Sequence, residues 1–199
     1  MAPGSLFPGL YLYIAAGIFF AVCLLQLVLV LYRNNIGLSK AQISYDSRAI
    51  SVRVHLRRPI KVDTGQYINI WMPSASFWSF TQTHPFTVVS WSDTPQDHLD
   101  LFIQPRRGFT KELFSLSKYG PTTSIIGFNR PHRKTLPINQ YKNILMIATS
   151  YGITAHLPWL KKLIFDHYSR KTSVHRTHLV WQIKDLGRSH FSTLSNQYL

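Results

Sequence analysis

Hydrophobic side chains are distributed in three different ways along the 199-residue chain. Between Leu10 and Tyr32 they form one run without a charged residue, and Gln26 is its only strongly polar side chain. As far as Phe128 they then form short groups, rich in β-branched and aromatic residues, between Gly, Pro, Asp or Ser. After Lys142 the groups are longer, and one has helical spacing. The three patterns predict a membrane-length helix, a β-rich unit and a smaller α/β unit.

The first run is long enough to cross a bilayer, so we interpret residues 10–32 as a transmembrane helix. A cleaved signal peptide and a buried core helix are the alternatives. Residues 1–9, however, contain no Lys or Arg, and the run is apolar on every side. Positive side chains follow it, beginning with Arg33 and Lys40, which predicts a single-pass protein with a cytoplasmic soluble part and a short extracytoplasmic N-terminus.

The β-rich unit is expected to span residues 36–130. Its strand-like segments are residues 41–45, 50–56, 66–72, 85–91, 99–104 and 122–128. Short strands at this spacing predict a six-stranded antiparallel β-barrel. One helix is expected at residues 110–117, with Thr110 as a candidate cap.

A basic, Pro-containing linker at residues 131–141 precedes the α/β unit, residues 142–199. Residues 143–148 form a run typical of a strand buried on both faces, residues 153–168 have helical spacing, and residues 177–183 form a second strand. Together they predict one βαβ unit. Residues 187–199 do not show the further strands and helices that such a sheet needs, so we expect a partial nucleotide-binding domain.

Charge and cysteine content narrow the class of partner. The chain has 22 Lys and Arg against 8 Asp and Glu, a formal net charge of +14. Beside a membrane helix, this excess favours anionic lipid or a phosphate-bearing cofactor over nucleic acid, with a simple solvated basic face as the alternative. Cys23 is the only cysteine, which excludes an intrachain disulfide. His175 and His178 lack a third ligand nearby in the sequence, so no metal site is predicted.

The tetrapeptide His84-Pro85-Phe86-Thr87 offers the groups that a flavin needs. Phe86 provides a flat apolar surface for the ring, Thr87 a hydroxyl for the ring nitrogens, and His84 a donor toward the ribityl or phosphate part. Pro85 fixes its own φ and helps to hold its neighbours. Ordinary barrel packing is the alternative interpretation of such a strand.

A second motif, Arg107-Gly108-Phe109-Thr110, joins a strand to a predicted helix. Free backbone N–H groups and the positive end of the helix would face an anion there, and Gly108 permits close approach. Arg106 and Arg107 add charged donors, although a solvated turn would contain the same residues. Together the two motifs favour a flavin site more strongly than either does alone.

These motifs also carry a resemblance to the ferric-chelate reductases, a membrane family related to the NADPH oxidases. The resembling stretches are GQYINIWMP (65–73), HPFTVVSW (84–91), FIQPRRGFT (102–110) and HLPWLKKL (156–163). The resemblance implies a ferredoxin-reductase-type FAD domain, with FAD held by residues 84–87 and 107–110. It further implies electron flow from NADPH through FAD and transmembrane haem to ferric iron, at the plasma membrane.

The chain departs from this family in ways that bear on function. No histidine precedes His55, so haem is not expected in this chain, and a haem-bearing membrane subunit or the missing portion of the reductase is the expected partner. The family's NADPH loop has two glycines one residue apart, whereas this chain has Ser150, Gly152 and then Ile153. Because serine disfavours the positive φ that glycine allows and would crowd a pyrophosphate, weakened NADPH binding is predicted.

Two functional hypotheses remain open at this point. One is a membrane-anchored oxidoreductase fragment of ferric reductase type. The other is a non-catalytic membrane-anchored FAD-binding or interaction module from a fragmented gene. Neither hypothesis assigns a catalytic residue to this chain.

Overall fold

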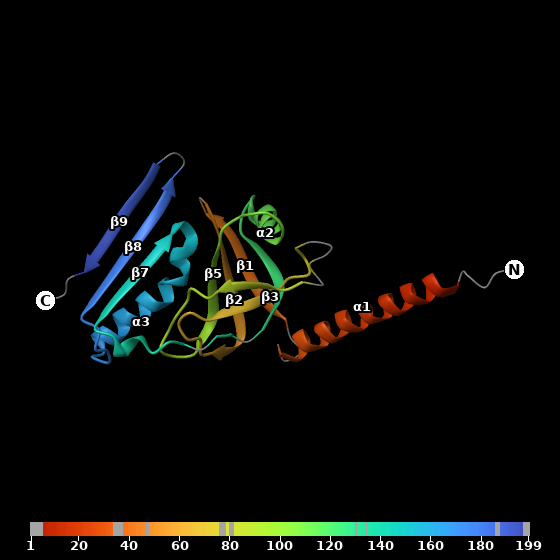
Figure 1. Ribbon diagram of the computed structural model, residues 1–199, viewed down its shortest axis with the longest axis horizontal. Helices are drawn as coiled ribbons and strands as arrows, with labels where there is room; N and C mark the ends of the chain where they lie inside the picture. Colours follow the sequence, from red (N-terminus) through yellow and green to blue (C-terminus); the bar gives the residue numbers. More distant parts are fainter. Residues whose placement is uncertain are drawn as a thin grey trace.

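A computed structural model describes residues 6–33, 38–46, 48–75, 79, 82–129, 131–133, 135–185 and 188–196. In Figure 1 a long helix leads from the N-terminus to a curled sheet, and a second, smaller sheet with one helix lies on the far side of the first. The fold class is therefore the predicted one.

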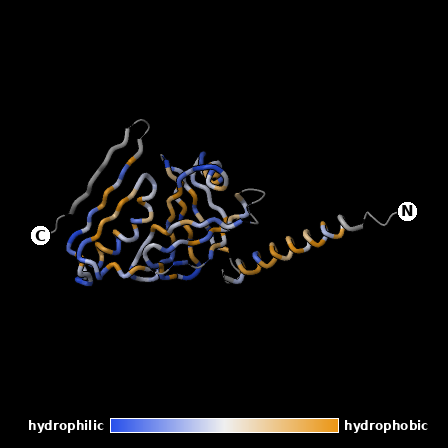
Figure 2. Tube along the Cα trace, viewed as in Figure 1, coloured by the Kyte–Doolittle hydropathy of each residue, from blue (hydrophilic) through white to orange (hydrophobic). Residues whose placement is uncertain are grey.

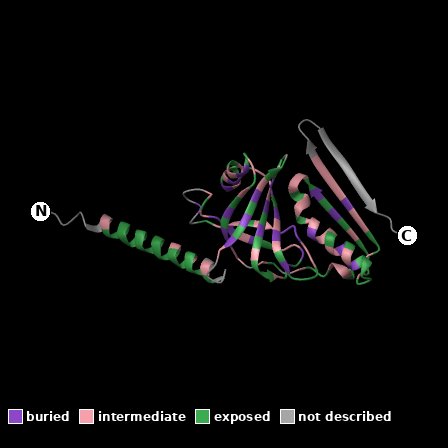
Figure 3. Cartoon of the chain, turned by 180° about the vertical axis from the view of Figure 1, so that it is seen from behind, coloured by how far each residue is buried: buried purple, intermediate pink, exposed green. Residues whose placement is uncertain are grey.

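Helix α1, Leu6–Arg33, contains the predicted membrane-length segment. Residues Gly9–Leu29 have a mean hydropathy of 2.5, and none of this stretch is buried within the protein. Figure 2 shows the helix as apolar along most of its length, and Figure 3 shows it as exposed. By length and composition, α1 can cross a membrane.

The first sheet contains six antiparallel strands in the order β4-β3-β6-β1-β2-β5. Their bounds are β1 Ser39–Asp46, β2 Ala49–Ile60, β3 Tyr67–Trp71, β4 His84–Thr87, β5 Gln96–Ile103 and β6 Thr122–Phe128. Buried and exposed residues alternate along β1 and β2, as one covered face requires. The core side chains include Ile43, Val52, Ile68, Leu101 and Ile126.

Strand β4 is shorter than predicted, because the chain leaves β3 after Thr87. The Val88 N–H still donates to the Gln66 carbonyl, but the Val89 N–H donates to Asp100 of β5, at 2.8 Å. The chain thus crosses from one end of the curled sheet to the other. This crossing brings the two outermost strands of the sheet together as a partly open barrel.

Helix α2, Phe109–Ser117, follows β5 and covers the barrel core with Leu113. It begins one residue earlier than predicted. Gly108 occupies the N-cap position and no side chain caps the helix, so the prediction of Thr110 as the cap was wrong. The Thr110 hydroxyl instead accepts a hydrogen bond from the Arg106 N–H, at 2.8 Å, and closes the preceding turn.

The second sheet has the order β7-β8-β9, with β7 parallel to β8 and β9 antiparallel to β8. Its elements are η2 Ile138–Gln140, β7 Asn143–Thr149, η3 Ser150–Ala155, α3 Leu157–Tyr168, β8 Arg176–Asp185 and β9 Arg188–Asn196. The predicted βαβ unit is present, and Pro158 lies in the first turn of α3, where proline is tolerated.

Two expectations about this unit were wrong. Residues 188–196 form a third strand, which pairs with β8 as a hairpin rather than as a parallel strand. Strand β7 is buried on one face only: Met146 and Ala148 are covered, whereas Leu145 and Ile147 are 63% and 64% exposed. The helix α3 contributes Leu163 to the cluster around Met146, and no element among the described residues covers the other face.

Candidate functional site

The first predicted motif lies on β4, at the edge of the barrel beside β3. Thr87 pairs with Tyr67 and Phe86 with Ile68. The side chains of Phe86 and Thr87 are half-buried, and Pro85 is exposed. Within the described part of the chain, no group forms a hydrogen bond with the Thr87 hydroxyl. The Phe86 ring packs in part against the barrel core, and the half-buried Thr87 hydroxyl follows it at the end of the strand.

Phe109 connects this motif to the second one. Its ring stacks on the His84 ring, with centroids 4.2 Å apart and planes 17° apart, and lies 6.1 Å from the Phe86 ring. Phe109 is itself only 8% exposed. The packing of these three rings places the first turn of α2 directly beside β4.

The environment of His84 favours its neutral form. Burial lowers the pKa of His84, and the nearby Glu112 carboxylate opposes this effect only in part. A neutral imidazole can donate one hydrogen bond and accept another. His84 is therefore suited to contact a polar ligand group without adding charge.

The turn before α2 has an open, donor-rich shape. Gly108 has φ +70 and ψ −139, a conformation that other residues rarely adopt. A Cβ atom at Gly108 would meet nothing within 4 Å, and the Arg107 side chain is exposed. The Lys111 and Glu112 N–H groups donate to the Gly108 carbonyl. The N–H groups of the first residues of a helix, here Phe109 and Thr110, have no acceptor within the helix itself. This arrangement suits an anion.

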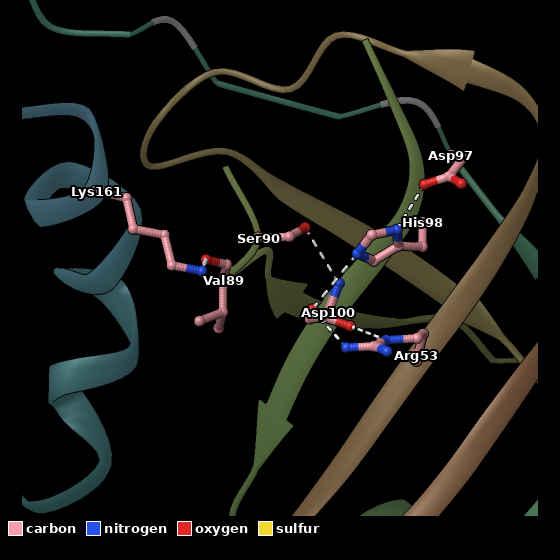
Figure 4. Close-up of polar contacts among 7 residues, drawn as sticks. All are labelled: Arg53, Val89, Ser90, Asp97, His98, Asp100 and Lys161. Atoms are coloured by element: carbon pink, nitrogen blue, oxygen red, sulfur yellow. Dashed lines mark hydrogen bonds and ion pairs between the residues drawn. The ribbon is translucent and has the colours of Figure 1, made fainter. Parts of the chain in front are cut away.

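The segment that follows the first motif is held from both sides, as Figure 4 shows. On the barrel side, the backbone carbonyl of Asp100 accepts a hydrogen bond from the Val89 N–H, and the Asp100 N–H donates to the Ser90 hydroxyl at 3.1 Å. The Asp100 carboxylate forms an ion pair with Arg53 at 2.7 Å. On the other side, Lys161 of α3 donates to the Val89 carbonyl at 3.4 Å. The α/β unit thus contacts the backbone two residues beyond Thr87.

The predicted nucleotide loop lies at the carboxyl end of β7. Ser150 adopts φ +49, so serine does take up the positive φ that it was expected to disfavour. Gly152 is exposed, with nothing within 4 Å of a Cβ atom there, and Ile153 packs against the small core of this unit. The loop therefore presents open backbone at the edge of a parallel strand pair, where α/β sheets commonly bind ligands.

Comparison with known proteins decides the family. A family described as an FAD-binding domain matches residues 35–155, which is more than half of the chain. The chain belongs to this FAD-binding family. The match includes the motifs at residues 84–87 and 107–110.

Curated relatives of this FAD-binding chain are metal reductases. It is 26% identical over 159 residues to ferric reductase transmembrane component 3 of Saccharomyces cerevisiae, covering 77% of this chain and 21% of that protein. It is 22% identical over 105 residues to ferric reduction oxidase 5 of Arabidopsis thaliana, covering 52% of this chain and 15% of that protein. The resemblance to the ferric-chelate reductases is confirmed, and the chain spans about a fifth or less of these relatives' length.

Solved structures show the same fold. Phthalate dioxygenase reductase has a TM-score of 0.57 at 10% identity, covering 77% of this chain and 46% of that one. A ferredoxin NADP+ reductase from Neisseria gonorrhoeae, with bound FAD and NADP, has a TM-score of 0.54 at 16% identity, covering 72% and 56%. The FAD domain of this chain therefore has the ferredoxin-reductase type of fold.

The residues of the two motifs fit FAD. Phe86 offers a ring face, Thr87 a hydroxyl, and His84 a neutral imidazole, while Gly108 leaves space before the end of a nine-residue helix. A flat ring and a pyrophosphate need these two kinds of surface at one place.

Four other residues near the site were not singled out from the sequence. Hydrogen bonds to backbone carbonyls are donated by Lys161 to Val89, by Tyr151 to Arg48 and by Trp181 to Ser150. The Trp159 ring lies 3.0 Å from the place that a Cβ atom of Gly65 would occupy. Aromatic and basic residues are common in both units, and their partners are distant in sequence. Only the tertiary structure shows these contacts.

Proposed function

We propose that this protein is a membrane-anchored, FAD-binding oxidoreductase module of ferric reductase type. It receives electrons from NADPH and passes them toward a haem path and ferric iron. The observation that supports this most directly is the stacking of His84 on Phe109 at 4.2 Å, because it joins the ring surface on β4 to the anion-binding end of α2.

FAD, when bound, supplies the ability to accept electrons in pairs and release them singly. The residues of the chain bind and orient it. Phe86 packs on the ring, Thr87 donates to its polar edge, and the backbone around Gly108 together with Arg107 binds the pyrophosphate. Lys161 and Asp100 hydrogen-bond to the Val89 backbone, two residues beyond Thr87, from opposite sides.

NADPH is proposed to bind at the loop formed by Ser150, Gly152 and Ile153. The open backbone at Gly152 supports this, as does the position of the loop at the carboxyl end of a parallel strand. The left-handed conformation of Ser150 gives the loop the backbone shape that a glycine would allow.

The module is proposed to sit on the cytoplasmic face of the plasma membrane, anchored by α1. The basic residues that follow α1 support this orientation. Arg57 and Arg58, in the C-terminal part of β2, and Lys61, just after this strand, are exposed and are suited to anionic lipid headgroups. A haem-bearing subunit, or a further part of the reductase, is the proposed electron acceptor.

The test uses the full chain in lipid nanodiscs. Bound FAD is measured by absorbance, and NADPH-dependent reduction of a dye acceptor is measured in the same sample. Flavin at about one per chain with dye reduction is the expected result. Flavin without reduction would favour a non-catalytic FAD-binding module, and no flavin would refute both functions.

A variant pair locates the site. Phe86→Ala combined with Thr87→Ala should lower bound flavin at least about tenfold, because ring packing and a hydrogen bond are lost together. Phe102→Ala combined with Thr123→Ala is the matched control, since both of these residues are exposed on other strands. Equal flavin content in the two variants would place the FAD site elsewhere.

A further inference from the structure

The loop after β7 contains a backbone conformation that its residue does not favour. Ser150 has φ +49, in the left-handed region where residues other than Gly, Asn and Asp are uncommon. Serine adopts this region only when surrounding contacts hold it there. The structure shows two such contacts on the loop, one from each side.

The first contact comes from β8. Trp181 is the register partner of Ala148, and its indole Nε1–H donates to the Ser150 carbonyl at 2.9 Å. The bond is partly buried, so losing its donor would leave a carbonyl with poorer access to water. Because the indole is attached to a strand, it presents the donor at a defined position.

The second contact comes from the barrel. The Tyr151 hydroxyl donates to the Arg48 carbonyl, in the turn between β1 and β2. The Tyr151 carbonyl in turn accepts from the Thr154 hydroxyl at 2.9 Å, within the loop. Tyr151, the residue after Ser150, is thus hydrogen-bonded to the barrel.

We propose that Trp181 and Tyr151 are positioning residues that hold the nucleotide loop in its left-handed conformation without a glycine at position 150. The loop is then set before the nucleotide arrives, and its shape depends on the barrel as well as on the α/β unit. The consequence for NADPH rests on the proposed function, because the affinity falls in proportion to the fraction of molecules that hold the loop in this conformation.

The decisive experiment measures hydrogen exchange of peptides covering residues 149–156 in the full chain in nanodiscs, without nucleotide. Trp181→Phe keeps the aromatic packing and removes the donor. It should accelerate exchange about three- to tenfold, the range that one hydrogen bond contributes. The same change made in a Ser150→Gly background should accelerate exchange less than about twofold, because glycine adopts the left-handed region without help.

Matched variants distinguish a positioning role from a general loss of stability. Trp91→Phe also removes an indole N–H, but Trp91 packs on Phe165 and not on the loop, so exchange of residues 149–156 should be unchanged. Tyr151→Phe should accelerate exchange of this loop, whereas Tyr141→Phe, at an exposed position, should not. Unchanged exchange in Trp181→Phe, or equal acceleration with serine and with glycine at position 150, would overturn the proposal.

Nucleotide binding is measured separately. In a wild-type chain that binds NADPH, Trp181→Phe should raise the dissociation constant by the factor by which it lowers the fraction of molecules that hold the loop, at most about tenfold. Adding Ser150→Gly should restore the dissociation constant to within about twofold. Failure of the wild type to bind NADPH would refute the nucleotide part of the proposed function, while the exchange data alone would still decide the positioning roles.

Discussion

Gly65→Ala places a methyl group where the two units of the protein meet. Gly65 is the third residue of a turn from Asp63 to Gln66, closed by a Gln66 N–H to Asp63 carbonyl bond of 3.3 Å, and it has φ +76. A Cβ atom there would lie 3.0 Å from Cζ2 and 3.2 Å from Nε1 of Trp159, a residue of α3. Both the backbone and the contact therefore oppose a side chain.

The two effects have different sizes. A left-handed conformation costs alanine about 1 kcal/mol, and the smaller entropy of the unfolded alanine chain offsets about 0.4–1 kcal/mol of this. Crowding of a packed side chain costs about 1–3 kcal/mol. Trp159 packs against the cluster of Met146, Leu163 and Leu179, which limits how far its ring can move. We therefore expect a net loss of about 1–3 kcal/mol, most of it from the contact.

Thermal unfolding of the full chain, followed by near-ultraviolet circular dichroism, measures this loss. For a chain of this size each kcal/mol lowers Tm by about 2–4 °C. In a Trp159→Ala background Gly65→Ala should cost less than about 1 kcal/mol, because only the backbone term remains. Equal losses in the two backgrounds, within about 0.5 kcal/mol, would refute the contact with Trp159 as the cause.

His84, the Arg53–Asp100 pair and Leu113 give further measurable outcomes. Burial lowers the pKa of His84 below 6.5, so the unfolded chain binds a proton first as pH falls, and the free energy of unfolding should decrease from pH 6.5 down to the folded-state pKa. In urea titrations at several pH values, His84→Gln should remove part of this decrease, and an identical decrease would contradict the argument. The Arg53–Asp100 ion pair is partly exposed, so a double-mutant cycle should give a coupling free energy of about 0.2–1 kcal/mol, and 1 M salt should reduce it. A coupling above about 2 kcal/mol that does not change with salt would be inconsistent with this exposure. Leu113 is 1% exposed, so Leu113→Ala should lower the free energy of unfolding by about 2–5 kcal/mol in denaturant unfolding. Leu145 is exposed, so Leu145→Ala should lower it far less. Similar losses in the two variants would argue against the described core.

The barrel strands were predictable because alternation and turn residues act locally. The segment Thr122–Phe128 was predicted with its observed bounds, and β1 extends only slightly beyond the predicted range. Strand β2 continues well past the predicted end at residue 56, to Ile60. The end of β4 was not predictable, since it depends on which distant carbonyls accept the N–H groups of Val88 and Val89. Strand β9 was missed because its pairing partner, and not its own pattern, makes it a strand.

The candidate site was predictable as two motifs and not as one surface. The residue types in His84–Thr87 and Arg107–Thr110 indicated a ring site and an anion site, each with an alternative. Their proximity depends on the stacking of His84 and Phe109, which β-sheet order and the start of α2 bring about.

By itself, the sequence determined the membrane-length helix, the order of the three parts, and the chemical groups offered to FAD. These follow from local composition, because side-chain polarity and backbone preference act over a few residues. The tertiary structure alone decided that Ser150 is held at a positive φ, since the Trp181 and Tyr151 hydrogen bonds that oppose its intrinsic preference come from contacts that local sequence does not encode. It also decided that Phe109 joins the two motifs, because burial of one ring by another requires strands and helices to be already in place.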